Sequence, residues 1–395
     1  MKKDFMFTSE SVTEGHPDKV CDQISDAIVD HFLEQDPCSA VRAECAVATS
    51  VLFIASRFAS RATVDFANTA RRVIKEIGYE DRDFSYKTCS ILTSLKELSQ
   101  EEYSCFDDAS LSDEDIERIS VRNQATVYGF ACNQTPSLMP MPIWLAQKLS
   151  RRLTLAMRQS ILPFLAPDGK TQVGVEYRAS KAHRIHTITV STSLREPKKL
   201  ERKKVEDDIL EYVIKPAFAE APIRPDSKTR IFVNPEGTLL LGGPAIHSGL
   251  TGRKNAVDTY GEYGRHSDSA LSGKDPMRID RVGPYAARYA AKNLVAAGLA
   301  EECEVQLSYS IGLSRPVSIQ VDSFDTGKLP DKELATLIKK HFDFRLGGIL
   351  KEFGLRTLPS KMKGGFYRKL AAHGHVGRMD MDLPWERTDK VDLLK

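Results

Sequence analysis

Residues suited to hold a phosphate group gather where a loop enters a predicted helix near the N-terminus. The segment Gly15-His-Pro-Asp-Lys19 ends that loop, and its proline suits the first turn of the helix. Free backbone N–H groups and the helix dipole favour an anion at this point. His16 and Lys19 add donors for phosphate oxygens, and Asp18 offers a hard carboxylate oxygen to a divalent metal. The same residues also fit an ordinary capped helix start with solvated charges.

Two further clusters pair small residues with cations, as a phosphate-binding loop requires. They are Gly249-Leu-Thr-Gly-Arg-Lys254 and Ser272-Gly-Lys-Asp-Pro276, and Asp280 follows the second as another carboxylate suited to a metal. Neither cluster has the G-x-x-x-x-G-K-S/T spacing of a P-loop, which disfavours ordinary P-loop chemistry. Pro167-Asp-Gly-Lys170 predicts a type I turn, with Lys170 as a further cation. Several cations and two carboxylates from separate segments indicate one polyphosphate with Mg²⁺ held between domains.

The order of predicted elements repeats three times along the chain. A helix after Pro17, strands at 41–48 and 51–58, and a helix at 62–77 ending before Gly78 form the first set. The second set is a helix at 142–159, strands at 171–177 and 185–193 and a helix at 202–214, and the third is a helix at 285–297, strands at 303–311 and 317–321 and a helix at 331–341. We therefore expect an α+β protein whose three similar domains pack around a pseudo-threefold axis with helices covering the sheets. The predicted domains are 1–102, 116–233 and 234–395.

Two segments between the predicted elements favour functional roles. Residues 99–115 are polar with little periodicity, which predicts a flexible loop and a candidate lid. Residues 235–274 are rich in glycine, which predicts backbone brought close to another group. The seven cysteines are widely spread without a C-x-x-C pair, so we expect buried small apolar residues rather than ligands or nucleophiles.

Composition limits the classes of partner. The 395 residues are 41% apolar and 8% aromatic, which is ample for ordinary folded cores. Lysine and arginine (56) nearly balance aspartate and glutamate (54), so no single-sign field predicts a nucleic-acid or membrane partner. No apolar run approaches the length of a membrane span, and no apolar stretch follows the N-terminal lysines. We expect a cytoplasmic protein.

Taken together, these motifs resemble the S-adenosylmethionine synthetase (methionine adenosyltransferase) family. The matching segments are Phe7-Thr-Ser-Glu-Ser-Val-x-Glu-Gly-His-Pro-Asp-Lys19, Gly242-Gly-Pro, Gly249-Leu-Thr-Gly-Arg-Lys-x-x-Val-Asp-Thr-Tyr-Gly261, Ser272-Gly-Lys-Asp-Pro276, Tyr285-Ala-Ala-Arg-Tyr-Ala-Ala-Lys-Asn293, Ala296-Ala-Gly-Leu299 and Pro384-Trp-Glu-Arg-Thr-Asp-Lys390. They extend over essentially the whole chain. The resemblance implies three domains with pseudo-threefold symmetry, a homodimer with two active sites at the subunit interface, and often a dimer of dimers.

The resemblance also implies a reaction and its cofactors. The sulfur of methionine attacks C5′ of ATP, triphosphate leaves, and the enzyme cleaves it to phosphate and diphosphate. A thioether is a neutral nucleophile that needs no strong base, so catalysis rests on alignment and on neutralising the leaving group. Carried over by position, the implied roles are the triphosphate leaving group for His16, Mg²⁺ for Asp18 and Asp280, K⁺ for Glu44, phosphate oxygens for Lys170, Arg253, Lys254 and Lys274, and a ribose hydroxyl for Asp168.

The sequence departs from the family at the thioether end of the pocket. The family holds the methionine ammonium with two carboxylates and a glutamine, and the aligned positions here are Arg57, Asn123 and Leu98. A cation and two neutral groups cannot balance a buried ammonium, and an unpaired buried charge costs several kcal/mol. A methionine-end lysine aligns with Arg278.

The nucleoside end departs as well. Leu239 takes the place of the phenylalanine that stacks on adenine, and it offers no π face. His247 aligns with an aspartate that faces the ribose, and Ser267-Asp-Ser269 replaces a glycine run. The phosphate and metal residues are thus retained while both ends of the pocket change.

Three interpretations remain open. The protein is an ordinary synthetase with compensating changes, or it forms a sulfonium from a different nucleoside triphosphate, a different thioether, or both. On charge alone, Arg57 favours a substrate with a carboxylate where methionine has its amine. The third interpretation is an inactive paralogue that regulates an active synthetase. The retained polyphosphate residues disfavour it, since a silent partner needs none of them.

Overall fold

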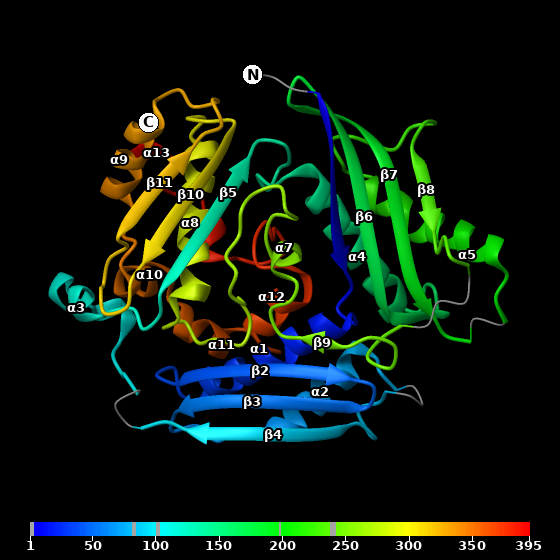
Figure 1. The fold of residues 1–395 in the computed structure, drawn as a ribbon, viewed down its shortest axis with the longest axis horizontal. Helices are drawn as coiled ribbons and strands as arrows, with labels where there is room; N and C mark the ends of the chain where they lie inside the picture. Colours follow the sequence, from blue (N-terminus) through cyan, green and yellow to red (C-terminus); the bar gives the residue numbers. More distant parts are fainter. Residues whose placement is uncertain (1–3, 81–83, 100–102, 197–198, 238–241) are drawn as a thin grey trace.

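The computed structural model describes residues 4–80, 84–99, 103–196, 199–237 and 242–395. Figure 1 shows three β-sheets around a central region that contains helices, with the N-terminal strand in the right-hand sheet. The strand order of the right-hand sheet is β1 (Phe5–Val12), β6 (Leu165–Arg178), β7 (Lys181–Leu194) and β8 (Arg230–Val233). The strand order of the left-hand sheet is β11 (Ser318–Asp322), β10 (Glu302–Tyr309) and β5 (Ala125–Cys132). The strand order of the lower sheet is β4 (Ser90–Glu97), β3 (Val51–Ala59), β2 (Ala40–Ala48) and β9 (Gly249–Leu250).

One long helix covers each sheet. Helix α1 (Pro17–Gln35) packs on β2, α4 (Met141–Arg158) on β6, and α8 (Ile279–Ala296) on β5. The apolar residues that predicted α1 recur at helical spacing and are at most 1% exposed: Val20, Ile24, Ile28 and Phe32. Burying this stripe against the sheet stabilises the helix by about 25 cal/mol for each Å² of apolar surface.

A second helix follows each pair of strands and completes the repeat. These helices are α2 (Phe66–Ile77), α5 (Arg202–Ile209) and α9 (Asp331–His341), and α5 continues through a π-helical turn (Leu210–Ile214) into α6 (Lys215–Phe218). Helix α2 starts later than predicted because Asp65 caps it, and it ends at Gly78 with φ 104°. Helix α8 starts before the predicted residue 285, because the helix continues through Pro284. The predicted threefold repetition of helix, two strands and helix is confirmed.

The sheets exchange strands between distant parts of the chain. Strand β1 pairs antiparallel with β6, so Phe5 lies opposite Tyr177 and Val12 opposite Lys170. Strand β5 pairs with β10, and the short β9 pairs with β2. Residues 5–12 thus belong to the sheet of the predicted central domain. The domain boundaries at 102, 116 and 234 stay a prediction.

The predicted turn at Pro167–Lys170 is wrong, because these residues lie inside β6. The pairing of Val12 with Lys170 and the hydrogen bond from the Thr13 N–H to the Gly169 carbonyl (2.9 Å) hold the segment extended. A register shift against β7 between Leu165 and Gly169 absorbs the irregular geometry. Neighbouring strands therefore override the local turn preference of the sequence.

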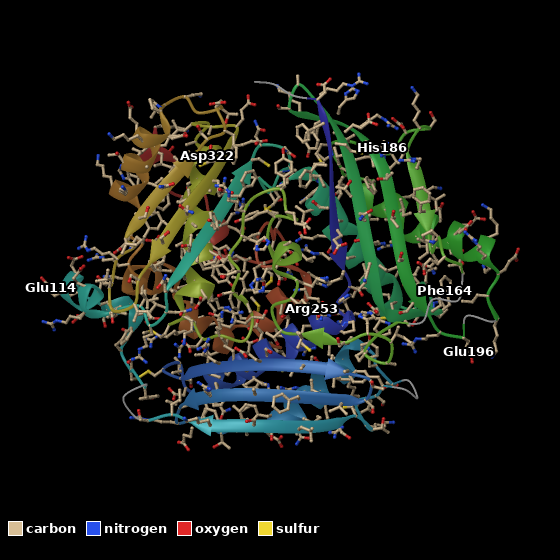
Figure 2. The ribbon with its side chains drawn as sticks, viewed as in Figure 1. Glu114, Phe164, His186, Glu196, Arg253 and Asp322 are labelled. Atoms are coloured by element: carbon tan, nitrogen blue, oxygen red, sulfur yellow. A yellow bond between two sulfur atoms is a disulfide. The ribbon has the colours of Figure 1, made fainter. Side chains whose placement is uncertain are left out.

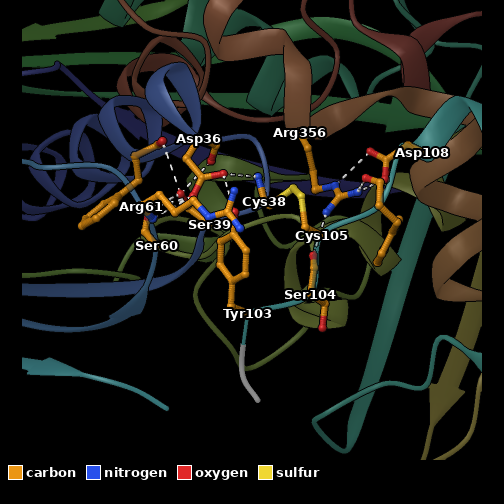
Figure 3. The surroundings of a disulfide bond; sticks show 12 residues. Asp36, Cys38, Ser39, Ser60, Arg61, Tyr103, Ser104, Cys105, Asp108 and Arg356 are labelled. Atoms are coloured by element: carbon orange, nitrogen blue, oxygen red, sulfur yellow. Dashed lines mark hydrogen bonds and ion pairs between the residues drawn. A yellow bond between two sulfur atoms is a disulfide. The ribbon is translucent and has the colours of Figure 1, made fainter. Parts of the chain in front are cut away.

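The described part of the predicted flexible loop is anchored rather than free (Figure 3). Cys105 forms a disulfide with Cys38, 67 positions away in the sequence, and the Tyr103 hydroxyl donates a hydrogen bond to Asp36 (3.1 Å). The Arg356 guanidinium donates to the Asp108 carboxylate (3.1 Å). Residues 100–102 lie outside the described residues. Movement of this segment as a lid stays a prediction.

The disulfide also corrects the prediction for two of the seven cysteines. Cys38 and Cys105 are bridged, whereas the remaining five are free and buried as expected: Cys21, Cys45, Cys89, Cys132 and Cys303. The bridge joins the segment before β2 to the segment after β4, a proximity that sequence spacing cannot reveal.

Short helices complete the fold. They are α3 (Asp113–Arg118), α7 (Asn255–Asp258), α10 (Leu346–Phe353), α11 (Leu358–Lys361), α12 (Tyr367–His373) and α13 (Val391–Leu394), with 3₁₀ turns at Asp108–Ser110, Leu355–Thr357 and Pro384–Glu386. Among the described residues, none of the helices combines the length and the apolar character that crossing a bilayer requires.

Candidate active site

The turn between β1 and α1 presents His16 at the start of the helix. His16 is the N-cap residue, and its Nδ1 accepts a hydrogen bond from the Asp18 N–H (3.2 Å). Gly15 is needed there, since a Cβ on it would lie 2.3 Å from the Pro167 carbonyl oxygen. This close approach brings the N-terminus of α1 against β6, and with it His16 against Asp168.

Three buried carboxylates on one face of α1 hold the two glycine-containing loops. Asp18, Asp22 and Asp26 follow each other at intervals of four residues and are each at most 1% exposed. Each accepts a hydrogen bond from a loop N–H group. The donors are Leu250 (3.0 Å to Asp18), Gly252 (2.7 Å to Asp22) and Gly273 (2.8 Å to Asp26). The sequence interpretation missed Asp22 and Asp26, although their i, i+4 spacing was a signal available in the sequence.

The first group of charged residues surrounds Asp18. Arg253 Nε lies 2.9 Å from Asp18 Oδ1, and Lys254 Nζ lies 3.8 Å from Oδ2. Asp18 Oδ2 is buried without a hydrogen-bond partner among the described residues. An orphaned carboxylate oxygen beside two cations fits a ligand for Mg²⁺, with phosphate oxygens shared between metal and cations. Figure 2 shows Arg253 near the centre of the molecule, between the lower sheet and the two upper ones.

Asp168 joins the same group from β6. Its Oδ2 accepts hydrogen bonds from the Gly243 N–H (2.7 Å) and from His247 Nε2 (2.8 Å), and the rings of His16 and His247 lie 5.0 Å apart. Burial raises the pKa of Asp168, but the hydrogen bond from His247 and the nearby His16 outweigh it and keep this pKa below its ordinary value. Burial lowers the pKa of His16 to about 4. His16 is therefore a neutral imidazole near pH 7, and the bond accepted at Nδ1 leaves its proton on Nε2.

The second group surrounds Asp280 at the start of α8. The amide of Asn123 donates to both carboxylate oxygens of Asp280, at 2.7 and 2.9 Å. Lys274 is 7% exposed, and its burial lowers the pKa of its amine despite the opposing charge of Asp280. Because both Asp280 oxygens have a partner, this carboxylate is less open to a metal than Asp18.

Arg57 lies in a row of cations on the outer face of the lower sheet. It stands directly opposite Arg42 on β2 and Lys96 on β4 in the strand register. Side chains of directly opposed residues share one face of a sheet, so these three cations are neighbours. None of them forms an ion pair with another described residue. Leu98 follows the end of β4, and its N–H donates to the Phe58 carbonyl.

Arg42 connects this row with the Lys274 loop through an isolated antiparallel bridge to Lys274. Glu44, two residues further along β2, is exposed beside the same loop and acts on the Lys274 amine electrostatically. Arg278 Nε lies 3.9 Å from the buried Asp275. These contacts connect Arg57 and the predicted K⁺ ligand Glu44 with the Asp280 group. The sequence interpretation did not include Arg42 or Lys96.

Of the remaining predicted residues, one forms no ion pair with either group and the other is not among the described residues. Lys170 is exposed on β6, two residues after Asp168, and forms no ion pair with a described residue. Leu239 lies outside the described residues. No hydrogen bond or ion pair between described residues joins Asp18 to Asp280. Within one chain, the Asp18 and Asp280 groups are connected indirectly, through Asp18 and Asp26 of α1, which hold the loops at Leu250 and Gly273.

A cavity of about 650 Å³ opens beside Asp168. Its lining includes three aromatic side chains, Tyr79, Phe84 and Phe164, together with Ile246. The Ser193 hydroxyl, also in the lining, donates to the Asp168 carbonyl (2.7 Å). Figure 2 shows Phe164 at the lower end of the right-hand sheet. These rings provide aromatic surface next to the Asp168 carboxylate, and sequence reasoning missed them because they come from separate segments.

The fold defines a class of α+β proteins built from three repeated units, here with a buried carboxylate and cations at the N-terminus of α1. Models of the S-adenosylmethionine synthetase N-terminal, central and C-terminal domains match residues 4–100, 118–239 and 241–387. The S-adenosylmethionine synthase of Acaryochloris marina (strain MBIC 11017) is 48% identical over 409 residues, covering 100% of this chain and 97% of that protein. Those of Gloeothece citriformis (strain PCC 7424) and Trichormus variabilis (strain ATCC 29413 / PCC 7937) are each 48% identical over 408 residues with the same coverage. The chain belongs to the S-adenosylmethionine synthetase family. The predicted family and fold class are confirmed.

Proposed function

We propose that the protein converts ATP, L-methionine and water to S-adenosylmethionine, phosphate and diphosphate in the cytoplasm. The observation that carries this proposal is the environment of Asp18. One carboxylate oxygen is held by the Leu250 N–H and Arg253, while the other is buried and unpartnered at a helix N-terminus. This arrangement suits a metal-bound triphosphate, and family membership supports both the substrates and the use of Mg²⁺ and K⁺.

The residues of the Asp18 group divide the work of stabilising the leaving triphosphate. Neutral His16 donates its Nε2 proton as a hydrogen bond to an oxygen of the leaving group without itself changing charge. Arg253 and Lys254 neutralise negative charge that accumulates on the departing phosphates. Asp168 accepts a hydrogen bond from a ribose hydroxyl and so orients C5′. Asp18 and Asp280 would hold Mg²⁺, which would supply further charge stabilisation.

We further propose that a second copy of the chain completes each site. The Asp18 group of one protomer then faces the Asp280 group of its partner, with Lys274, Arg278, Glu44 and Lys170 adding their charges. Two observations support this arrangement: no hydrogen bond or ion pair among the described residues joins the Asp18 group directly to Asp280, and apolar residues are exposed on the outer face of the lower sheet. The residues are Val51, Phe53 and Leu92, with exposed fractions of 40%, 42% and 55%. Further pairing of dimers is also part of the proposal.

The direct test is product analysis with the purified full chain. Methionine, Mg²⁺ and K⁺ are supplied with ATP, GTP, CTP or UTP, and phosphate release and sulfonium products are followed by mass spectrometry. We expect S-adenosylmethionine with ATP, and its loss in Asp18→Asn but not in Asp207→Asn, a change on the exposed surface of α5. Absence of any product and of triphosphate hydrolysis with every nucleotide would instead support the regulatory paralogue.

A second candidate function is the same sulfonium-forming reaction with a different thioether or nucleotide. The row of Arg42, Arg57 and Lys96 favours it, because these cations repel the ammonium of methionine and attract an anionic group. Methionine lacking its amino group is the discriminating substrate. A higher kcat/KM for this compound than for methionine, reversed by Arg57→Glu, supports the second candidate. A clear preference for methionine, unchanged in Arg57→Gln, excludes it.

A further inference from the structure

A group of nitrogen and oxygen ligands lies beside the residues that the proposed reaction uses for Mg²⁺. His16, Asp168 and His247 each offer one ligand atom, and the three atoms lie within 4.8 Å of one another. It is the only group of three or more such residues found in the described part of the chain. The three side chains come from the turn before α1, from β6 and from the loop before β9. The fold, and not a local motif, assembles them.

The carboxylate of Asp168 provides an independent indication of a ligand site. Its side chain is buried, with 5% of the residue exposed, and its Oδ2 is occupied by the Gly243 N–H and His247. Its Oδ1 is buried and has no hydrogen-bond partner among the described residues. Leaving such an oxygen unsatisfied is costly, and more so for a charged group. A cation bound at this oxygen would remove the cost.

The two imidazoles decide which cation suits the group. The rings of His16 and His247 lie 5.0 Å apart with an interplanar angle of 55°. Two imidazole nitrogens and one carboxylate oxygen form a ligand set typical of Zn²⁺ and similar late first-row divalent ions. Mg²⁺ prefers oxygen ligands and retains its water. The group is therefore chemically distinct from the Asp18 site.

Asp18 lies where a supporting hydrogen bond for a metal-bound His16 is needed. Its Oδ2 is 3.6 Å from His16 Nδ1 and is itself buried without a partner. When a metal takes Nε2, the single ring proton moves to Nδ1, which then gives up the bond that it accepts from the Asp18 N–H and can donate to this oxygen. Carboxylate groups commonly orient metal-binding histidines in this way.

We propose that His16, Asp168 and His247 bind one Zn²⁺-like divalent ion, with an open position for water. Binding of this ion does not depend on the proposed reaction, but His16 and Asp168 are also the residues proposed to contact the nucleotide. The bound ion and the nucleotide therefore exclude each other, and Zn²⁺ inhibits the protein in competition with ATP.

The test uses Co²⁺ as a spectroscopic probe of the metal-free full chain. We expect one equivalent of Co²⁺ to give the intense visible d–d bands of a four-coordinate site with nitrogen ligands, and Zn²⁺ to abolish them while millimolar Mg²⁺ does not. His247→Asn weakens binding by at least about tenfold. His183→Asn, which removes an exposed histidine on β7, leaves binding unchanged.

Each outcome of this titration decides the proposal. Equal binding by the wild type and His247→Asn, or no one-to-one complex, overturns it, provided that circular dichroism shows the variant folded. His16→Gln is a second variant that must lose the same bands. Because ATP also chelates Co²⁺ in solution, competition is measured from the protein side: at a buffered free Co²⁺ concentration that saturates the bands, the Kd of Mg²⁺-bound ATP must rise, and an unchanged Kd overturns the competition. Because absorbance is measured without methionine, failure here is distinguishable from failure of the proposed reaction.

Discussion

Replacing the buried Lys19 by methionine should destabilise the protein strongly near neutral pH and much less in acid. Lys19 is fully buried and forms ion pairs with two buried carboxylates, Asp22 (3.0 Å) and Asp258. Burial alone lowers the pKa of the lysine, but both carboxylates outweigh it and raise this pKa above its ordinary value. Lys19 is thus charged in the folded protein and neutralises part of a buried pair of acids.

The magnitude follows from the cost of protonating the carboxylate that loses its partner. In wild type, burial already raises the pKa of Asp258 to about 7, so this group is half protonated near neutral pH. Without Lys19, the buried Asp22 must also bind a proton. Its ordinary pKa is 3.8, so protonation at pH 7 costs about 4 kcal/mol and at pH 5 about 2 kcal/mol, at 1.36 kcal/mol for each pH unit. The removal of one partner of a buried ion pair typically costs 3–5 kcal/mol.

The sign of the pH dependence is fixed by the direction of these shifts. A carboxyl group with a raised pKa in the folded state binds more protons than in the unfolded state between the two pKa values. Its contribution to stability is complete below about pH 4 and is lost as the pH rises through the folded value, about 7 for Asp258. The variant adds Asp22 to this behaviour, so the destabilisation grows from pH 5 to pH 7.

The assay is urea unfolding of wild type and Lys19→Met at both pH values. The matched control is Lys204→Met, because Lys204 also pairs with an aspartate (Asp208, 3.5 Å) but its side chain is 69% exposed. The control should change the free energy of unfolding by less than about 0.5 kcal/mol. An equal loss for Lys19→Met at pH 5 and pH 7 would show that lost packing, and not unpaired charge, dominates, and would refute the reasoning.

Three further predictions concern the site and the anchored loop. Because burial lowers the pKa of His16 to about 4, His16 stays neutral through the neutral range, so kcat/KM should stay constant from pH 8 to pH 5.5; a fall centred near pH 6.5 would contradict this. Phe164→Ala should raise the KM for the nucleotide about tenfold, from the loss of about 1.5 kcal/mol of ring contact, whereas Phe232→Ala on β8 should not. Cys105→Ser should lower the free energy of unfolding by about 2–4 kcal/mol under oxidising conditions, whereas in reductant the variant and wild type should be equally stable. An equal loss in reductant would mean that packing at Cys105 is responsible.

The repeated order of elements could be predicted because its signals lie in contiguous residues, whereas anion binding at the start of α1 stays a prediction. The apolar spacing of α1 and the glycine end of α2 are local features, and α1 begins after His16 and α2 ends at Gly78 as the sequence predicts. The same is true of Asp18, which a loop, a proline and a helix start mark together. Local geometry needs no knowledge of the rest of the chain.

Only the tertiary structure decided which distant residues meet. The pairing of β1 with β6 turned the predicted turn at Pro167–Lys170 into a strand, because hydrogen bonds to a neighbour outweigh a weak local preference. Asp168 and His247 are 79 residues apart and meet because the loop before β9 folds back over β6. Arg57 stands in a row of cations because of the strand register, since a shift of one residue would turn its side chain to the other face. Register and long-range contact depend on the partner strand, and no single segment of sequence contains that information.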